Sequence, residues 1–556
     1  MCIRDRVKVE GNNLLILPIN IDPYKTIEDL RSSDLNLRIK KVLIDIPEVG
    51  EIDAIYIMIP KSVVLQKLKD GKIEKLPTFI REALNQLHEE DLEQIIKAYP
   101  ISTKRIIVEV PPGTSNLLVN EIAQLGTIII FQEDSSGKLV EKVLHLTKIK
   151  EAYDGGKKII LPSYAIGLIE EIAKRYRIKA QIDYGVPLKH LTNVNGNVNL
   201  LPYQAESLES WLLNNKRGTI VIPTGGGKTY IALAAIQELK VPAIIFVPNT
   251  WLLDQWIDRI ASILRVPKGL IGVLGKGIKK IKEITVATYQ SGYKYVDELT
   301  DKFVLAIFDE AHHVPARTFK DVALNLRAIY RMALSATPKR RDGNEVLLFK
   351  LVGGIVYNIG YRKLVQLGVI APVAIRKILV PLPKERIMEY KRIERKMQLS
   401  NNEFERRRYV NALIEIARDN PIKLEVIKDL VNKHKSEKIF IFAGSINFAE
   451  KIYQAVRHLT TVAILTSKTS TSKEERIIRG FQRGTIKCII LIKKGEEGID
   501  IGDASIAIIA GGSKQEREIL QRLGRILRGQ DGKLAFLYEI VTEYTIEENI
   551  SCLLYT

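Results

Sequence analysis

Residues 221–229 read Val-Ile-Pro-Thr-Gly-Gly-Gly-Lys-Thr and lie between an apolar run and a run with helical spacing. Consecutive glycines let backbone N–H groups converge on phosphate oxygens, and the helix N-terminus adds a favourable partial charge. In such a loop the lysine reaches the β- and γ-phosphates, and the next hydroxyl holds Mg²⁺. We therefore expect ATP and Mg²⁺ as cofactors, bound by Thr224, Gly225, Gly226, Gly227, Lys228 and Thr229. The alternative, a glycine-rich turn without a ligand, is disfavoured by the strand–loop–helix order.

A pair of carboxylates ends an apolar run downstream, where residues 305–312 read Leu-Ala-Ile-Phe-Asp-Glu-Ala-His. Phosphoryl transfer needs mainly positioning and charge neutralisation, and carboxylates can supply both. Asp309 is suited to Mg²⁺, directly or through water, and Glu310 is suited to polarising the attacking water. We expect Asp309 and Glu310 to be catalytic together with Lys228. His312 is expected to make a polar link to Ser335, Ala336 and Thr337, because no third ligand is spaced for a metal site.

The composition is that of a basic globular protein. The chain has 556 residues, 46% hydrophobic and 27% charged, which excludes wholesale disorder and fibrous repeats. The net charge of +19 favours a polyanionic partner such as nucleic acid, although a thermophile-like surface would also account for it. No run approaches the ~18 apolar residues of a membrane span, and no secretory signal is visible. Three cysteines without metal-ligand spacing fit a reducing, intracellular setting.

Alternation of short apolar strands with helices predicts an α/β fold. From residue 199 onward the strands are almost continuously apolar, which is typical of parallel sheets buried on both faces. The expected strands are 218–222, 243–247, 284–287 and 304–308, and then 438–442, 461–465, 487–492 and 504–510. Two α/β domains are implied. The region before residue 196 reads as mixed α/β without catalytic residues, including a helix over 76–99 and a strand over 105–110.

Further motifs follow in the order of the superfamily 2 helicases of the DEAH/DEXH type, which this chain resembles. Tyr203-Gln204 resembles the element in which a glutamine, here Gln204, reads adenine, and residues 334–338 resemble the coupling motif. Residues 498–500 resemble the nucleotide-and-strand motif, which implies that Gly498 and Asp500 bind the nucleotide. Residues 521–528 resemble the arginine-finger motif, which implies catalytic roles for Gln521, Arg525 and Arg528.

Residues 200–204, 309–316 and 522–528 further resemble the xeroderma pigmentosum B-type (XPB-like) helicases, particularly archaeal ones. The resemblance implies two RecA-like domains, an ATP-dependent DNA helicase or translocase acting on duplex or forked DNA in repair or transcription, and a nuclease or other partner protein. That family has an Arg-Glu-Asp motif where this chain has Arg340, Arg341 and Asp342, which are expected to contact nucleic acid. The resemblance also implies a thumb-like insertion at 384–418, in which Arg406, Arg407 and Arg408 could follow a phosphate backbone. A solvated charged helix is the alternative for that insertion.

The expected organisation is two tandem RecA-like parallel-sheet domains preceded by an α/β accessory region. The expected domains are 7–100 and 101–197 (accessory), 198–365 (ATP-binding) and 366–550 (C-terminal). Residues 1–6 and 551–556 resemble translated sequencing-adaptor DNA and are treated as probable artefacts. A cytoplasmic, nucleoid-associated protein of a prokaryote or archaeon, without a membrane partner, is expected. The rival interpretations are a branch-migration helicase of the same superfamily, the translocating subunit of a restriction system, and a non-catalytic nucleic-acid-binding scaffold.

Overall fold

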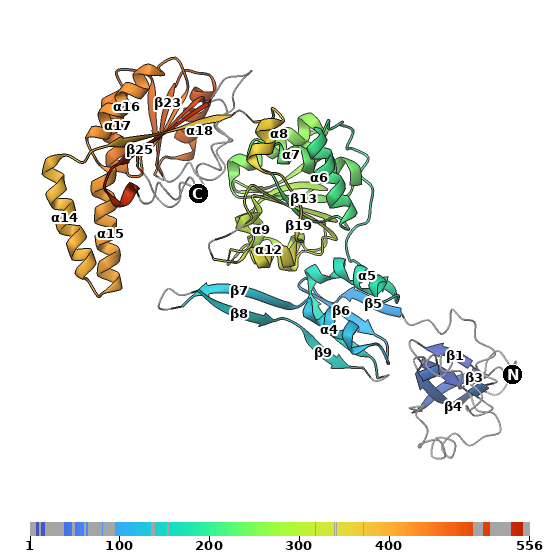
Figure 1. The fold of residues 1–556 in the computed structure, drawn as a ribbon. Coiled ribbons are helices and arrows are strands. Elements are labelled where there is room, and N and C mark those ends of the chain that lie inside the picture. Colours follow the sequence, from blue (N-terminus) through green and yellow to red (C-terminus); the bar gives the residue numbers. More distant parts are fainter. Residues whose placement is uncertain are drawn as a thin grey trace.

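The computed structural model divides the chain into an N-terminal sheet, an accessory unit and two larger α/β domains (Figure 1). The residues that the structure describes are 7–10, 13–16, 38–46, 50–60, 63–64, 80–81, 95–134, 139–152, 155–316, 318–338, 340, 342–370, 372–466, 468–492, 504–511 and 535–548. Among them, no helix is both long and apolar enough to cross a lipid bilayer.

The N-terminal sheet is antiparallel in its described part, with strand order β1-β2-β4-β3. Its strands are β1 (Val7–Glu10), β2 (Asn13–Ile16), β3 (Arg38–Ile46) and β4 (Gly50–Pro60). In β4, Tyr56, Ile57 and Ile59 are fully buried, so this strand contributes to a core.

The accessory unit contains a five-stranded sheet of order β11-β5-β6-β10-β9 and a separate two-stranded ribbon, β7–β8. The elements are β5 (Ile95–Pro100), β6 (Arg105–Val110), α4 (Asn116–Gln124), β7 (Thr127–Glu133), β8 (Leu139–His145), β9 (Lys148–Glu151), β10 (Lys157–Pro162), α5 (Ile166–Arg175) and β11 (Lys179–Ile182). Because β5 pairs with β6, this unit already includes residue 95, and the expected boundary at 100/101 is wrong. The predicted helix over 76–99 is also wrong for its last residues, because β-sheet pairing overrides their helical spacing.

The first large domain is built on an eight-stranded sheet of order β15-β14-β16-β13-β17-β18-β12-β19, parallel except for β15. Its strands are β12 (Arg217–Val221), β13 (Ala243–Val247), β14 (Ile271–Gly275), β15 (Ile278–Lys280), β16 (Ile284–Thr288), β17 (Leu305–Asp309), β18 (Tyr330–Ser335) and β19 (Ile355–Asn358). Its helices include α6 (Pro202–Leu213), α7 (Lys228–Leu239), α8 (Thr250–Ile263), α9 (Tyr289–Lys294), α11 (Lys320–Asn325), α12 (Glu345–Leu351) and α13 (Tyr361–Gln366). Strands β12, β13, β16 and β17 are buried at every residue, as their sequences predict.

The second large domain has a six-stranded parallel sheet of order β20-β25-β24-β21-β23-β22. Its described strands are β20 (Val373–Val380), β21 (Ile439–Phe442), β22 (Val462–Leu465), β23 (Cys488–Leu491), β24 (Ile506–Ile509) and β25 (Ala535–Thr542). Its described helices are α14 (Lys384–Leu399), α15 (Glu403–Arg418), α16 (Ile422–Lys433), α17 (Ile446–Val456) and α18 (Thr471–Gln482). Two parallel-sheet domains of the RecA type, predicted from the sequence, are thereby confirmed.

Helices α14 and α15 form a hairpin that projects from the second domain at the position of the expected insertion 384–418 (Figure 1). Tyr390 is buried at its base, where the phenol oxygen accepts a hydrogen bond of 2.6 Å from the backbone N–H of Ile546. Leu413 and Ile416 pack beside Tyr390 in the same small core. Phe404, near the tip, is 78% exposed.

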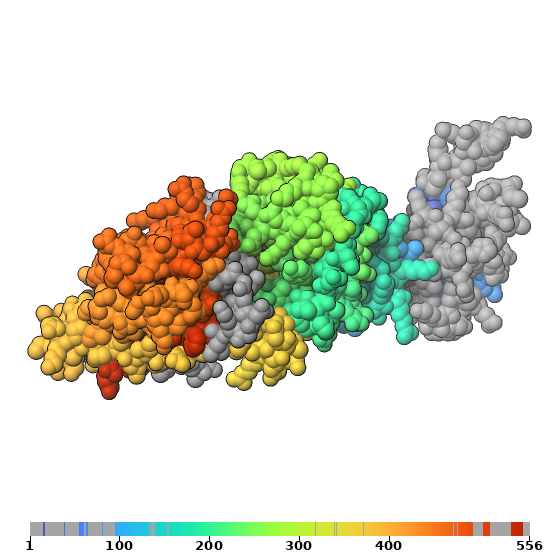
Figure 2. All heavy atoms as spheres, turned by 90° about the horizontal axis from the view of Figure 1, so that it is seen from above, coloured from blue at the N-terminus to red at the C-terminus, as the bar shows by residue number. Residues whose placement is uncertain are grey.

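The accessory unit and the first large domain share one hydrophobic core, which contains Ile106 and Ile166 on one side and Phe246 and Phe308 on the other. The guanidinium of the fully buried Arg331 lies over the Tyr164 ring, 5.8 Å from its centroid. The two units adjoin in the space-filling view, with the second large domain on the opposite side of the first (Figure 2). The unit that we expected as a separate domain is therefore packed as an extension of the first large domain.

Candidate nucleotide-binding and hydrolysis site

The glycine-rich loop joins β12 to α7 and requires glycine at two positions. Gly225 and Gly227 have φ values of +84° and +73°, in the left-handed region that residues with a Cβ rarely adopt. A Cβ on Gly227 would lie 2.3 Å from Nε2 of Gln204, and a Cβ on Gly226 would lie 2.5 Å from Cγ2 of Ile222. The three successive glycines thus allow the tight turn that opens α7.

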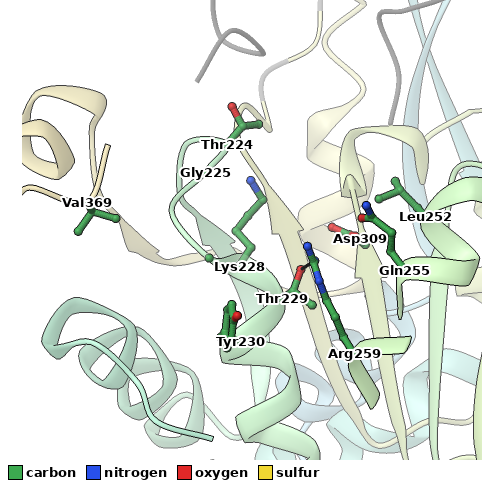
Figure 3. Close-up of a pocket in the computed structure, with 11 residues that line it drawn as sticks. Thr224, Gly225, Lys228, Thr229, Tyr230, Leu252, Gln255, Arg259, Asp309 and Val369 are labelled. Carbon is green, nitrogen blue, oxygen red and sulfur yellow. Dashed lines mark hydrogen bonds between the residues drawn. The ribbon is translucent and has the colours of Figure 1, made fainter. Parts of the chain in front are cut away.

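Lys228 and Thr229 begin α7 and point into the same cavity (Figure 3). The buried ammonium of Lys228 donates a hydrogen bond of 2.9 Å to the Ile222 carbonyl, so the loop itself holds the cation in place. The Thr229 hydroxyl accepts a hydrogen bond of 2.9 Å from Nη1 of Arg259. Both groups have the chemistry that a triphosphate and its metal require, a cation and a hard oxygen ligand.

Tyr203 and Gln204, on α6, form hydrogen bonds to the glycine-rich loop. The Tyr203 hydroxyl donates to the Gly226 carbonyl over 2.7 Å, and Nε2 of Gln204 donates to the same oxygen over 3.2 Å. Oε1 of Gln204 accepts a hydrogen bond of 2.9 Å from the backbone N–H of Leu201. Both ends of the Gln204 carboxamide therefore have protein partners here, and adenine recognition by this residue stays a prediction.

Asp309 ends β17 and is 7% exposed. Its Oδ2 accepts a hydrogen bond of 2.9 Å from the indole of Trp256, and its Oδ1 accepts one of 3.0 Å from the Glu310 backbone N–H. The buried Tyr289 donates its hydroxyl proton to the Asp309 carbonyl over 2.9 Å. Burial, reinforced by the charge of Asp309, raises the pKa of Tyr289 well above its ordinary value, so this donor keeps its proton.

Glu310 follows with a left-handed backbone conformation, φ +47°, which is uncommon for a residue with a side chain. It is 7% exposed, and Oε2 lies 3.7 Å from Nδ1 of His312 in the short 3₁₀ helix η6 (Ala311–His313). His312 and His313 lie together with ring centroids 4.3 Å apart. This places the His312 imidazole beside Glu310, whereas its expected link to residues 335–337 stays a prediction.

The segment Ser335-Ala336-Thr337 lies between the phosphate loop and the two carboxylates because β18 separates β12 from β17 in the sheet. Val221 pairs with Ser335 on one side of β18, and Asp309 pairs with Leu334 on the other. The Ser335 carbonyl accepts a hydrogen bond of 3.1 Å from the Ile222 N–H, and its hydroxyl accepts one of 3.1 Å from the Thr337 N–H. A shift of this segment would therefore move both the phosphate loop and the loop that carries the two carboxylates.

One cavity of about 300 Å³ brings the phosphate loop and Asp309 together (Figure 3). Leu252, Gln255 and Arg259 line it from α8, and Trp256 of the same helix bonds Asp309. Sequence reasoning missed these residues. Their i, i+3, i+4, i+7 spacing, which places them on one face of a helix, is the signal that could have found them. Thr229 and Asp309 both line the cavity with oxygen atoms, the ligands that Mg²⁺ prefers, so this site fits the metal.

Arg340 and Asp342 are joined by a forked ion pair, with Nε–Oδ1 at 2.8 Å and Nη2–Oδ2 at 2.7 Å. Nη1 of Arg340 also donates to the His312 carbonyl. The Arg340 guanidinium thus has intramolecular partners on three of its nitrogens, and any contact of this pair with nucleic acid stays a prediction. Arg341 lies outside the described residues.

The remaining expected site residues belong to the second large domain. Gly498, Asp500, Gln521, Arg525 and Arg528 lie outside the described residues. Arg406, Arg407 and Arg408 lie on α15, exposed to solvent near the tip of the hairpin, where Arg407 forms an ion pair of 3.0 Å with Glu403.

Comparison with known proteins matches both large domains. Residues 197–340 match the family described as the res subunit of type III restriction enzymes, and residues 422–530 match the conserved C-terminal domain of helicases. The chain is 35% identical over 382 residues to the DNA 3'-5' translocase XPB2 of Sulfurisphaera tokodaii, covering 64% of this chain and 85% of that protein.

Two further relatives are more distant. The DNA 3'-5' helicase XPB of Kineococcus radiotolerans is 28% identical, with 63% of this chain and 61% of that protein covered. The XPB subunit of the TFIIH basal transcription factor complex of Trypanosoma brucei brucei is also 28% identical, with 68% of this chain and 44% of that protein covered. The chain therefore spans less than two thirds of the length of these two relatives.

Proposed function

This chain belongs to the XPB-like helicases of superfamily 2, and we propose that it uses ATP hydrolysis to move along, or to open, duplex or forked DNA. The observation that carries the proposal is the single cavity into which Lys228, Thr229 and Asp309 project, with Glu310 directly after Asp309 on the same loop. A cation, two hard oxygen ligands and a second carboxylate in that arrangement suit phosphoryl transfer to water.

In this proposal each residue has a distinct role. The Lys228 ammonium exchanges its bond to the Ile222 carbonyl for the β- and γ-phosphate oxygens of ATP. Thr229 and Asp309 would hold Mg²⁺, which when bound would neutralise charge on the phosphates. Glu310 orients the attacking water and accepts its proton, and His312, 3.7 Å away, positions that carboxylate. Trp256 and the Glu310 N–H keep the Asp309 carboxylate oriented in the site.

The second large domain would complete the site and turn hydrolysis into movement. Gln521, Arg525 and Arg528 are proposed to reach the γ-phosphate when the two domains close on ATP, and Gly498 and Asp500 to contact the nucleotide. Closing only in the presence of ATP lets each cycle shift one domain relative to the other along a strand. The exposed arginines and Phe404 at the tip of the α14–α15 hairpin suit a grip on the DNA backbone and bases.

The cellular setting is also a proposal. The names of the relatives support a role in DNA repair or transcription, with a nuclease or another repair or transcription protein as partner. The net charge of +19 is consistent with a protein that stays associated with DNA in the cytoplasm of a prokaryote or archaeon.

The test is steady-state ATP hydrolysis without nucleic acid and with single-stranded DNA, forked DNA or RNA. Hydrolysis should be stimulated most by DNA, should be abolished in Lys228→Ala, and should remain in Lys302→Ala, a control on the surface of the same domain. Glu310→Gln should bind ATP but turn it over slowly. Equal or greater stimulation by RNA would overturn the DNA assignment, and hydrolysis by Lys228→Ala at the wild-type rate would overturn the site.

A further inference from the structure

Asn344 occupies the N-cap position of α12, yet its side chain does not cap that helix. Asparagine is among the best N-cap residues because its side-chain oxygen accepts a free backbone N–H of the first turn. Here the carboxamide turns to the accessory unit instead. Oδ1 accepts a hydrogen bond of 2.8 Å from the Phe131 N–H, and Nδ2 donates one of 2.9 Å to the Phe131 carbonyl. The Asn344 side chain therefore bonds a residue 213 positions earlier in the chain and leaves the first turn of α12 without a side-chain cap.

Phe131 lies in the ribbon β7–β8, paired with Glu141 of β8. The N–H and C=O of one strand residue point to the same side, so these two groups of Phe131 face away from β8 and are paired by Asn344. The carboxamide therefore pairs with the free edge of β7 in the way that the backbone of an adjacent strand would. Gly343, with φ +68°, permits the close approach, since a Cβ there would lie 3.3 Å from the Phe131 ring.

From Asn344 a continuous set of polar contacts runs to the loop that carries Glu310. The Asn344 backbone N–H donates to Oδ1 of Asp342 over 3.1 Å, and Asp342 holds Arg340 in the forked ion pair. Arg340 in turn donates to the carbonyl of His312. Two residues before His312, Glu310 has a left-handed backbone conformation that persists only where its surroundings enforce it.

We propose that Asn344 is a positioning residue for ATP hydrolysis, which ties the ribbon β7–β8 through Asp342 and Arg340 to the loop that carries Glu310. The inference rests on the proposed role of Glu310. Docking of the ribbon then sets the position of the carboxylate.

The contact between Asn344 and Phe131 is not needed to hold the accessory unit against the first large domain. The two already share a hydrophobic core, and the buried Arg331 and Tyr164 meet across the same boundary. The two hydrogen bonds of Asn344 come in addition to that attachment, and they connect through Asp342 and Arg340 to the loop that carries Glu310. The role of Asn344 should therefore be visible in turnover more than in stability.

The first experiment compares full-length Asn344→Ala with Asn325→Ala, whose wild-type side chain bonds the Asp321 carbonyl within its own helix. Loss of two hydrogen bonds should lower kcat with DNA on the order of five- to tenfold, because each contributes modestly. KM for ATP and the stoichiometry of ATP binding should stay at wild-type values, whereas the unfolding midpoint should fall slightly because two hydrogen bonds are lost. Hydrogen exchange of peptides covering 308–314 should accelerate in Asn344→Ala and not in Asn325→Ala. A wild-type kcat in Asn344→Ala at full binding stoichiometry would overturn the proposal.

A second experiment tests the other partner of the contact. Phe131→Pro removes the N–H on the edge facing Asn344, where proline is tolerated, and Phe131→Ala removes the ring but keeps the N–H. Phe131→Pro should lower kcat more than Phe131→Ala does, and this extra loss should vanish when Asn344→Ala is also present. If the losses of kcat from Phe131→Pro and Asn344→Ala were additive in the double variant, the proposed coupling between the two residues would be wrong. Normal hydrolysis by Glu310→Gln would instead overturn the proposed function on which the inference rests.

Discussion

The indole Nε1 of Trp256 donates a hydrogen bond of 2.9 Å to Oδ2 of Asp309, which links α8 to the end of β17. Trp256 is 1% exposed and Asp309 is 7% exposed, so the bond is shielded from water. A buried carboxylate needs such donors because solvent cannot replace them. In our interpretation the indole therefore orients the carboxylate that holds Mg²⁺.

Trp256→Phe should weaken the response to Mg²⁺. The substitution keeps most of the apolar volume but removes the donor, and loss of a group that orients a metal ligand typically costs about tenfold or more in metal affinity. The measurement is ATP hydrolysis as a function of Mg²⁺ concentration, with half-maximal activity expected at a higher concentration. Trp211→Phe is the control, because it removes an indole hydrogen bond of 2.9 Å to the Arg331 carbonyl, which has no role in the site. An equal shift in both variants would refute the role of Trp256.

Gly227→Ala should impair ATP binding. At this position alanine would have to adopt a left-handed backbone conformation, which costs about 1–2 kcal/mol. Its methyl group would also clash with the side-chain amide of Gln204, which bonds the Gly226 carbonyl in the loop. The dissociation constant of a fluorescent ATP analogue should rise about tenfold or more, since 1.4 kcal/mol is a factor of ten. Gly354→Ala, in the same domain, has open space around the added Cβ and should bind like wild type. Unchanged binding by Gly227→Ala would mean that the loop can rearrange.

Sequence patterns predicted the strands of the two large domains to within one or two residues at most of their ends. The strand over 243–247 is observed with the predicted bounds because a continuous β-branched and aromatic run is buried on both faces of a parallel sheet. The strand over 105–110 is also observed as predicted. Lys228, Thr229 and Asp309, which two local motifs indicate, line one cavity because the sheet order brings those motifs to one edge, and their roles stay predictions.

What sequence could not predict depends on contacts between distant segments. Trp256 looks like an ordinary core residue of α8 until β17 is placed beside it. Residues 95–99 have helical spacing but become a strand because β6 offers a partner. Asn344 looks like a helix cap, and only the position of the ribbon shows that its carboxamide bonds Phe131. In each case the partner of the residue belongs to a distant segment, so tertiary structure decides the contact.

The Arg340–Asp342 pair should make the first large domain sensitive to acid. The Arg340 fork holds the pKa of Asp342 well below its usual range, so the folded-state pKa lies below the unfolded value near 3.9. The pair therefore contributes its full stability above about pH 4–5 and loses it as pH falls through the folded pKa. Urea midpoints between about pH 5 and 3 should fall more steeply in wild type than in Asp342→Asn.

Tryptophan fluorescence is a suitable readout for that titration, because all three tryptophans, Trp211, Trp251 and Trp256, lie in the first large domain. Asp301→Asn is the control, since Asp301 is half exposed and 3.8 Å from its Lys302 partner. Parallel pH profiles for wild type and Asp342→Asn would contradict the prediction.

Removal of one partner of a buried ion pair should strongly destabilise the second large domain. Nζ of Lys423 is bonded to both carboxylate oxygens of Glu547, at 2.8 and 2.7 Å, and to the Ala510 carbonyl. Lys423→Met would leave a buried carboxylate without its cation and should reduce the free energy of unfolding by about 3–5 kcal/mol. Lys428→Met, which removes an exposed pair with Glu425 on the same helix, should change it by about 1 kcal/mol or less. Far-UV circular dichroism in urea would measure both, and similar losses in the two variants would contradict the assignment.

The exposed arginines of the α14–α15 hairpin should set the salt dependence of DNA binding. Arg406, Arg407 and Arg408 are exposed beside the exposed Phe404, and each phosphate that a cation neutralises contributes about 0.9 to the slope of log K against log salt. Replacing all three with alanine should weaken binding to a duplex and reduce that slope by about 2 to 3 if all three contact phosphates. The matched control replaces Lys433, Lys435 and Arg457, which are exposed elsewhere on the same domain, and removes the same charge. A general loss of positive charge would lower both slopes equally, whereas a DNA grip at the hairpin would lower only the first. Unchanged slopes in both triple variants would mean that the hairpin arginines form a solvated surface, with Glu403 as the partner of Arg407.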